Sequence, residues 1–337
     1  MSQTLEVVDS NLPGVVGGGP SGDAGSCLFT VHLHRTLLLL ALLPLVLGPA
    51  AACAPRRIVE SVLAGNHFQL VRDVPYGTGP QQRLDVYRPR RRGSPAPVIV
   101  FLFGGRWQNG SREEYRLLGD ALTGAGVVTV VPDYRRYPEA RFPVWVEDAA
   151  RAVRWVRDSI GSLGGDPERI FVMGHSSGAH TATLLALDGH YLRDAGVPSS
   201  AVKGFISLAG PVATTWTDPD VQALMGPRQM WPRTYPMEQV NGSAKPLLLL
   251  HGERDRLVLP ANSTRLAARI RARGGCASVK LYRGLDHISI VLALALPRFN
   301  IAPVSDDVMA FVRLWSRKSP PMTSAGFRVN CDTVRAR

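Results

Sequence analysis

Short apolar runs alternate along the chain with longer segments in which apolar residues recur at helical spacing. Five runs are apolar almost throughout, which is typical of strands buried on both faces of a sheet. They are residues 97–103, 127–131, 170–173, 202–208 and 247–251, and residues 278–282 are expected to form a further strand. Helices are predicted between these strands and after the last one. They are residues 111–125, 143–160, 179–187, 260–273 and 306–316.

This alternation predicts a mostly parallel sheet with helices on both faces, because crossover helices join parallel neighbours. Residues 67–75 and 83–87 alternate apolar and polar positions around a Gly-Thr-Gly-Pro turn, which indicates an antiparallel hairpin at the edge of the sheet. Residues 111–114, Ser-Arg-Glu-Glu, predict a capping box at the start of a helix. The predicted fold class is α/β.

Residues 211–245 interrupt the alternation after the end of a predicted strand. They contain Trp216, Trp231 and five prolines. Binding loops of open α/β sheets lie at the carboxyl ends of strands, so we expect this segment to be a small cap over the site. The alternative is a solvent loop that carries a few core aromatics. The expected domain is residues 67–319, with a linker at 54–66 and a C-terminal tail at 320–337.

Residues 1–53 contain the layout of a secretory signal peptide. A short basic lead precedes an almost wholly apolar run at residues 37–47, and three alanines stand before Cys53. The run is shorter than the roughly 20 residues that span a membrane. Because the basic lead lies unusually deep in the chain, we hypothesise that translation starts near Val31 and that residues 1–30 are not part of the protein.

The cysteines bear on the location of the protein. Cys53 after its alanines resembles the lipobox of bacterial lipoproteins, although Ala50 stands where that motif usually has Leu. Three outcomes stay open: an envelope protein that is lipidated at Cys53, simple secretion, and an uncleaved anchor or no export. Cys276 and Cys331 remain in the exported part, where disulfides persist, and they either pair or stay as two thiols.

The formal net charge of +12 indicates a basic surface, and Arg88 and residues 90–92 form one arginine cluster. A solvated basic face is the simplest explanation, with an anionic envelope surface as a neighbour if the protein is exported. No basic motif with interleaved aromatics is present, so no nucleic-acid partner is expected. No C-x-x-C pair or His-rich cluster indicates a metal, and no cofactor is expected.

Residues 174–178, Gly-His-Ser-Ser-Gly, match G-x-S-x-G between a predicted strand and a predicted helix. A nucleophilic serine must stand on a sharp turn, and the glycines remove side chains that would clash there. A base and an orienting acid are then needed. Asp255 and His287 follow the next-to-last and last predicted strands, and the order Ser176, Asp255, His287 is the α/β-hydrolase order.

Other acidic and histidine side chains lie near these positions in the sequence. Glu253 is the alternative acid, and Asp286 is expected to be solvated. His175 is expected to line the pocket beside the serine. His180 is expected to pack on the helix, and His251 to be buried with its hydrogen bonds satisfied.

An oxyanion hole needs backbone N–H groups close to the serine. Ser177, which follows the nucleophile, is expected to supply one. The others are expected from residues 103–107, Phe-Gly-Gly-Arg-Trp, where Gly104 and Gly105 allow close backbone approach. The alternative is an ordinary glycine turn.

The chain resembles α/β-hydrolases of the hormone-sensitive-lipase-like and BD-FAE-like carboxylesterase group from about Leu84 to Trp315. The matching pieces are residues 103–107, Pro-Asp-Tyr-Arg at 132–135, Gly-Gly-Asp-Pro-Glu-Arg-Ile at 164–170, residues 174–180, and His-Gly-Glu-Arg-Asp at 251–255 with His287. The resemblance implies an oxyanion hole at Gly104, Gly105 and Ser177. It also implies structural roles for Asp133, Tyr134 and Arg135.

Phe103 departs from the His-Gly-Gly that such proteins usually have, and relatives such as isoprenylcysteine methylesterases and arylformamidases also vary here. Because the oxyanion donors are backbone groups, we expect Phe103 to weaken the ordering of the loop without abolishing the hole. The implied activity is hydrolysis of carboxylic esters with short to medium acyl chains through an acyl-enzyme. The alternatives are an arylformamidase-like amide hydrolase and a catalytically silent envelope binding protein.

Overall fold

The computed structural model describes residue 65 and residues 68–90, 93–212 and 215–317. All of them belong to one compact unit, Val59–Arg337. The predicted signal region with Cys53, the linker apart from Gly65, and the predicted tail with Cys331 lie outside the described residues.

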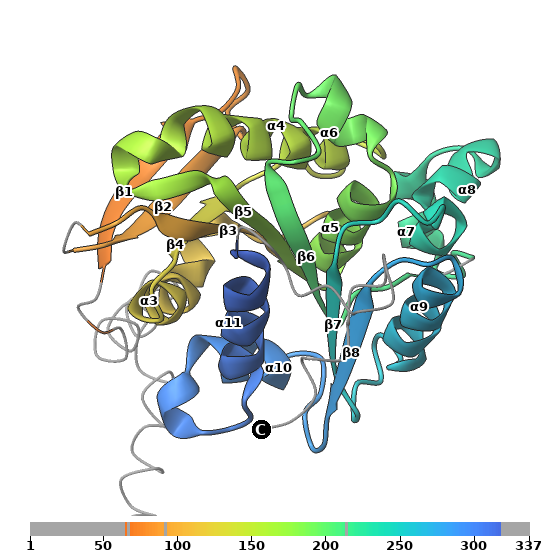
Figure 1. The fold of residues 1–337 in the computed structure, drawn as a ribbon. Coiled ribbons are helices and arrows are strands. Elements are labelled where there is room, and N and C mark those ends of the chain that lie inside the picture. Colours follow the sequence, from red (N-terminus) through yellow and green to blue (C-terminus); the bar gives the residue numbers. More distant parts are fainter. Residues whose placement is uncertain (1–64, 66–67, 91–92, 213–214, 318–337) are drawn as a thin grey trace, which may run out of the picture. The chain divides into compact units, whose positions relative to one another are not determined.

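A sheet of eight strands forms the centre of the described residues (Figure 1). In chain order the strands are β1 (Phe68–Pro75), β2 (Arg83–Pro89), β3 (Ala96–Leu102), β4 (Val128–Pro132), β5 (Gly165–His175), β6 (Val202–Leu208), β7 (Leu247–Gly252) and β8 (Ala277–Tyr282). Across the sheet their order is β1-β2-β4-β3-β5-β6-β7-β8. The pairings β1–β2 and β2–β4 are antiparallel, and all pairings from β4 to β8 are parallel. The predicted mostly parallel sheet with an antiparallel edge hairpin is therefore confirmed.

Helices cover both faces of the sheet, as predicted. They are α3 (Arg116–Gly124), α4 (Val144–Ser159), α5 (Ser177–Leu187), α6 (His190–Asp194), α7 (Pro219–Met225), α8 (Trp231–Thr234), α9 (Ala261–Ala272), α10 (Ser289–Ala295) and α11 (Val304–Trp315). Helices α3, α10 and α11 lie on one face, and α4 and α5 lie on the other (Figure 1). None of the described helices is long and apolar enough to span a bilayer.

The parallel strands are apolar because both of their faces are covered. In β3, every residue from 98 to 102 is fully buried, and so are the four leucines at 247–250 of β7, to within 1%. This packing fixes the carboxyl ends of β3, β5, β7 and β8, and the turns that follow these ends carry the predicted site residues.

The predicted capping box at residues 111–114 is wrong. Ser111 makes no side-chain cap hydrogen bond, and Arg112–Tyr115 form a 3-10 turn ahead of α3. A carboxylate from a distant part of the sequence accepts the backbone N–H at the start of this turn instead, because Arg112 N–H donates to Asp133 Oδ1 at 2.8 Å. The guanidinium of Arg112 also pairs with Asp133 and, at 3.1 Å, with Asp85. The short helices α6 and α10 were not predicted from the sequence.

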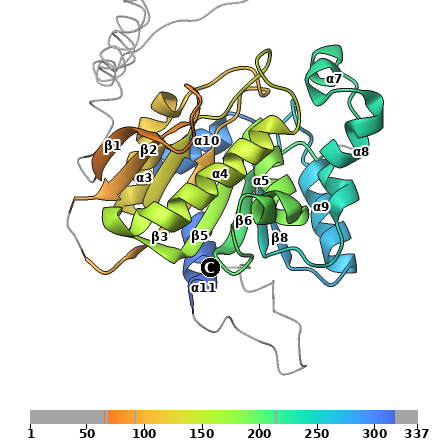
Figure 2. The same ribbon diagram turned by 90° about the horizontal axis from the view of Figure 1, so that it is seen from above.

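Residues 211–245, the predicted cap, contain α7, α8 and the 3-10 turns η5 (Arg228–Met230) and η6 (Pro236–Gln239). Helices α7 and α8 lie on the same side of the described residues as α9 in both views (Figures 1 and 2). The segment is anchored to α5, where His180 Nε2 lies 2.7 Å from the Thr234 carbonyl oxygen. Trp216 donates its indole N–H to Thr234 Oγ1 at 2.7 Å. These contacts make the segment a packed substructure and not a solvent loop.

Cys276, just ahead of β8, is held in a disulfide. Its partner lies outside the described residues, so pairing with Cys331 stays a prediction. The alternative of a free thiol at Cys276 is wrong.

Candidate active site

Ser176 stands on a strained turn between β5 and α5. Its φ of 53° and ψ of −121° place a non-glycine residue in a region that L side chains rarely adopt. The turn closes tightly, since a Cβ at Gly174 would lie 2.2 Å from the Gly178 carbonyl oxygen. A Cβ at Gly178 would lie 2.1 Å from the Leu102 carbonyl oxygen. Only glycine fits at either position, and the turn presents the serine at the end of the sheet.

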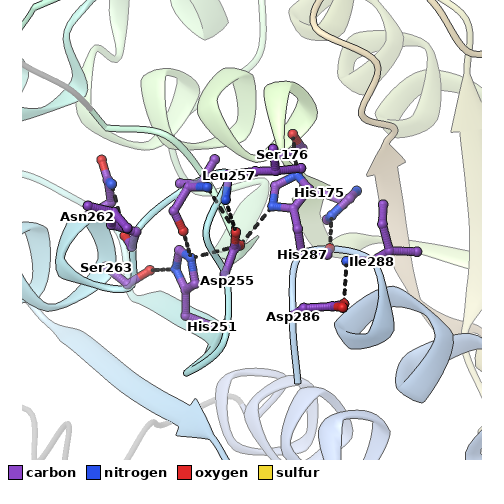
Figure 3. Close-up of polar contacts among 12 residues, drawn as sticks. His175, Ser176, His251, Asp255, Leu257, Asn262, Ser263, Asp286, His287 and Ile288 are labelled. Atoms are coloured by element: carbon purple, nitrogen blue, oxygen red, sulfur yellow. Dashed lines mark hydrogen bonds and ion pairs between the residues drawn. The ribbon is translucent and has the colours of Figure 1, made fainter. Parts of the chain in front are cut away.

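The structure brings the three predicted side chains into one hydrogen-bonded chain (Figure 3). His287 Nε2 lies 2.9 Å from Ser176 Oγ, and His287 Nδ1 lies 2.8 Å from Asp255 Oδ2. Asp255 is 2% exposed and His287 8% exposed, whereas Ser176 is only partly buried. The arrangement leaves the serine reachable while the acid and the base are held in the protein.

Asp255 is fixed by backbone donors as well as by His287. Its Oδ1 accepts the N–H groups of Leu257 and Val258, each at 2.9 Å. Oδ2, which faces His287, also lies 3.2 Å from His251 Nε2. The expectation that His251 is buried and hydrogen-bonded is confirmed, but its contact with the acid was not predicted.

His175 supports the base from the nucleophile strand. Its Nε2–H donates to the His287 carbonyl oxygen at 2.9 Å, and the two rings lie 4.8 Å apart. Burial, followed by the neighbouring His287, lowers the pKa of His175 to about 4, so the ring is neutral at pH 7. His175 is 6% exposed, so it lies beneath the site and does not form an open pocket wall.

The loop after β3 lies against the nucleophile, as expected for an oxyanion hole. A Cβ at Gly104 would come within 3.0 Å of both Ser176 Cβ and His175 Nδ1. Gly105 has a φ of +134°, and the next two residues, Arg106 and Trp107, also have positive φ values. The N–H of Ser177 at the start of α5 has no acceptor within the helix. The loop after β3 and the start of α5 thus meet beside Ser176.

Phe103, at the position where the sequence resemblance predicts histidine, takes part in an aromatic stack. Its ring is fully buried and stacks on Tyr134 at 4.6 Å and on Tyr115 at 5.7 Å between centroids. Its carbonyl oxygen accepts the Tyr134 hydroxyl at 2.8 Å. The loop is therefore held by stacking and by one buried hydrogen bond. This support could not be deduced from the local sequence, because Tyr134 lies beyond the next strand.

The rival residues occupy other positions. Glu253 is exposed, and its backbone N–H bonds to the Tyr282 carbonyl oxygen at 3.0 Å. Asp286 is exposed, as expected, and its carboxylate accepts the N–H groups of Ile288 and Ser289. These bonds, those from Ser289 above all, lower the pKa of Asp286. His180 packs against Trp107 and the cap segment. Among the described residues, no group of three or more His, Cys, Asp or Glu side chains is placed to hold a metal ion.

Comparison with known proteins connects this geometry to one family. The BD-FAE family model matches residues 84–270. Rice (Oryza sativa subsp. japonica) has a relative named "Probable isoprenylcysteine alpha-carbonyl methylesterase ICME", which is 29% identical over 246 residues, or 66% of this chain. Esterase LipQ of Mycobacterium tuberculosis is 30% identical over 284 residues, or 74% of this chain. The matches cover 59% of the rice protein and 66% of LipQ, so the chain spans less than two thirds of the rice relative's own length.

A solved structure supports the fold. Esterase B from Lactobacillus Rhamnosis aligns with a TM-score of 0.65 at 19% identity, covering 82% of this chain and 94% of that one. A likeness at this identity speaks for the fold alone. Together with the strand order and the covered sheet, it confirms the predicted α/β-hydrolase fold.

Proposed function

The chain belongs to the BD-FAE family and has the α/β-hydrolase fold, and from this premise we propose that it is a serine hydrolase of carboxylic esters. One observation carries the proposal: Ser176, on a strained turn, is joined to Asp255 through both ring nitrogens of His287. A nucleophile, a base and an orienting acid in this arrangement are the parts that acyl transfer needs.

In the proposed first half-reaction, Ser176 Oγ attacks the ester carbonyl while His287 Nε2 accepts its proton. Asp255 keeps the proton of the neutral base on Nδ1 and stabilises the imidazolium that forms. The carbonyl oxygen becomes negative as the tetrahedral intermediate forms. The N–H groups of Ser177, Gly104 and Gly105 are the proposed donors to it, since preorganised donors stabilise charge that develops in the transition state.

His287 then protonates the leaving alcohol, and an acyl-Ser176 intermediate remains. Water enters the vacated space and attacks the acyl carbonyl while His287 accepts its proton. The same oxyanion hole binds the negative oxygen of the second tetrahedral intermediate. Collapse of this second intermediate returns the proton to Ser176. The hydrogen bonds that join the three side chains keep His287 placed for each of these proton transfers.

Short to medium acyl chains are the proposed substrates. Leu257 and Ile288, which closely follow the acid and the base in the chain, are 78% and 56% exposed. Exposed apolar side chains that form one surface beside the site would favour contact with an apolar acyl chain. A series of nitrophenyl esters tests this proposal, and kcat/KM is expected to be highest for butyrate and octanoate and lowest for palmitate.

The decisive experiment is labelling of the full chain with a fluorophosphonate, together with ester and matched amide turnover. Wild type is expected to be labelled and to hydrolyse the ester in preference to the amide. Ser176→Ala is expected to lose both labelling and turnover, whereas Ser162→Ala, at a remote exposed serine, keeps them. A folded wild type that is neither labelled nor active would refute the proposal and favour a silent binding protein.

Export to the cell envelope is a further proposal, and it rests on residues 37–47 and Cys53 alone. Fractionation of cells that express the full chain is expected to place it in the envelope. Cys53→Ser is expected to release it if lipid holds it there. Recovery of the wild type in the cytoplasm would contradict export.

A further inference from the structure

His251, at the end of β7, lies directly behind the acid of the proposed site. Its side chain is fully buried, and Nε2 lies 2.7 Å from the Val258 carbonyl oxygen and 3.2 Å from Asp255 Oδ2. Its other ring nitrogen, Nδ1, lies 2.8 Å from the hydroxyl of Ser263 on α9 (Figure 3). Both nitrogens therefore have a partner, and the partners differ in kind.

The partners determine which nitrogen carries the proton. A carbonyl oxygen only accepts, so Nε2 bears the hydrogen and directs it toward Val258 and Asp255. Nδ1 is then the acceptor of the Ser263 hydroxyl. Burial of His251 lowers its pKa, which agrees with a neutral ring that has one N–H.

We propose that His251 is a positioning residue of the active site, which holds the carboxylate of Asp255 in line with His287 through its Nε2–H. This inference rests on the proposed function. Val258 is held at both ends, because its N–H donates to Asp255 Oδ1 and its carbonyl accepts from His251. The ring of His251 thus closes the turn that aims the carboxylate, and Ser263 ties this turn to α9.

Oδ2 of Asp255 is shared by two histidines with different tasks. His287 Nδ1 lies 2.8 Å from it and His251 Nε2 lies 3.2 Å from it. Removal of the second donor leaves more uncompensated negative charge beside His287, which favours the protonated imidazole. It also frees the carboxylate and the turn to rotate, which weakens the alignment of the base with Ser176.

Three further polar groups lie close to His287, Asp255 or His251. His175 on β5 donates to the His287 carbonyl oxygen and is neutral. Asp286, which precedes the base, turns its carboxylate toward the start of α10. From α9, the group that faces His251 is the uncharged hydroxyl of Ser263.

The test compares His251→Phe, which removes the donor, with His251→Gln, whose amide can supply an N–H at the Nε2 position. His251→Phe is expected to lower kcat/KM for a nitrophenyl ester by about 10- to 100-fold, the usual cost of a hydrogen bond to a charged group, with KM within about twofold. The acid limb of its kcat/KM profile is expected to move to higher pH. His251→Gln is expected to recover most of the activity and the wild-type limb.

Two outcomes would overturn the proposal. One is wild-type kinetics in both variants. The other is equal loss in both with no movement of the pH profile, which would mean that His251 only fills space. Circular dichroism and thermal melting check that each variant is folded.

Nitrogen NMR of the wild type provides a readout that needs no variant and no turnover. His251 is expected to be the neutral Nε2–H tautomer at neutral pH, and the Nδ1–H tautomer would overturn the proposal. Absence of turnover and labelling in wild type would instead refute the proposed function, and the tautomer would still decide the role of His251.

Discussion

Asp255 is held from both of its carboxylate oxygens, and this restricts what can replace it. Oδ1 accepts two backbone N–H groups, and Oδ2 faces the ring nitrogens of His287 and His251. Three of these neighbours hydrogen-bond to the carboxylate, and the fourth, His251 Nε2, lies 3.2 Å from Oδ2. An amide at this position must keep its oxygen on the backbone side, since the N–H groups there cannot move without unfolding the turn.

Asp255→Asn is therefore expected to place its NH₂ toward His287 and to force the imidazole into the wrong tautomer. Nδ1 would then accept, and Nε2 would carry a hydrogen toward Ser176 that prevents it from acting as a base. A fall in kcat of about 10⁴-fold is expected, as for the same change in other serine hydrolases. Steady-state ester kinetics measure it. Glu253→Gln, at the exposed rival acid, is the control and is expected to stay within about twofold of wild type.

At the scale of elements, the junction of β5 and α5 determines where the nucleophile stands. The helix begins so close to the end of β3 that a Cβ at Gly178 would meet the Leu102 and Phe103 carbonyl oxygens at 2.1 and 2.4 Å. Backbone atoms cannot yield as a flexible side chain can. The same closeness brings the oxyanion loop to Ser176, so packing and chemistry depend on one glycine.

Gly178→Ala is expected to destabilise the protein by about 3 kcal/mol or more, because the added methyl group pushes α5 away from β3. Ester turnover is expected to fall with it. Gly161→Ala is the matched control, because a Cβ there meets nothing within 4 Å, and it is expected to be neutral or to stabilise by up to about 1 kcal/mol. Urea denaturation of both variants measures the difference. Equal stabilities would contradict the close approach.

Tyr134→Phe tests the support of the oxyanion loop. Burial raises the pKa of Tyr134, so its hydroxyl keeps its proton and donates to the Phe103 carbonyl. Loss of this donor leaves a buried carbonyl unpaired and is expected to cost about 1–3 kcal/mol of stability. We expect kcat to fall while KM changes little, because the loop serves the transition state. Stability loss with unchanged kcat would mean that the loop is ordered without this bond.

The sequence predicted those elements whose apolar pattern is simple. Buried parallel strands such as β3 read as continuous apolar runs, and the turns after them carried the chemistry. The polar first half of β5, Gly165–Arg169, has no apolar pattern and was not predicted as strand. It joins the sheet through the pairing of Gly165 with Ala96, which is distant in the sequence. The contacts that hold the site, from Tyr134 to Phe103 and from His251 to Asp255, join residues whose proximity only the folded chain creates.

At the scale of the whole molecule, burial lowers the pKa values of three described histidines, His175, His180 and His251. Burial lowers the pKa values of His175 and His180 from the ordinary 6.5 to about 4. Between these values the unfolded chain binds protons that the folded chain does not. The contribution of these neutral histidines to the free energy of unfolding is therefore fully present above about pH 6.5 and is lost as the pH falls toward 4. The neutral ring of His175 hydrogen-bonds to the backbone of His287, and that of His180 hydrogen-bonds to Thr234 in the cap segment.

His180→Gln isolates one of these contributions, because the amide keeps a donor for the Thr234 carbonyl and cannot be protonated in this range. In wild type, His175 and His180 are each expected to lower the free energy of unfolding by about 1.4 kcal/mol for every pH unit that the pH falls within the window. Over the whole window this is about 3 kcal/mol for each of the two histidines. In His180→Gln the change of the free energy of unfolding with pH is expected to be smaller by the contribution of one histidine. The free energy of unfolding at pH 8 is expected to stay within about 1 kcal/mol of wild type. Urea denaturation across the range measures both slopes. A variant with the wild-type slope would show that His180 is protonated alike in the folded and unfolded chains, and that the α5–cap contact adds nothing to the acid sensitivity of the fold.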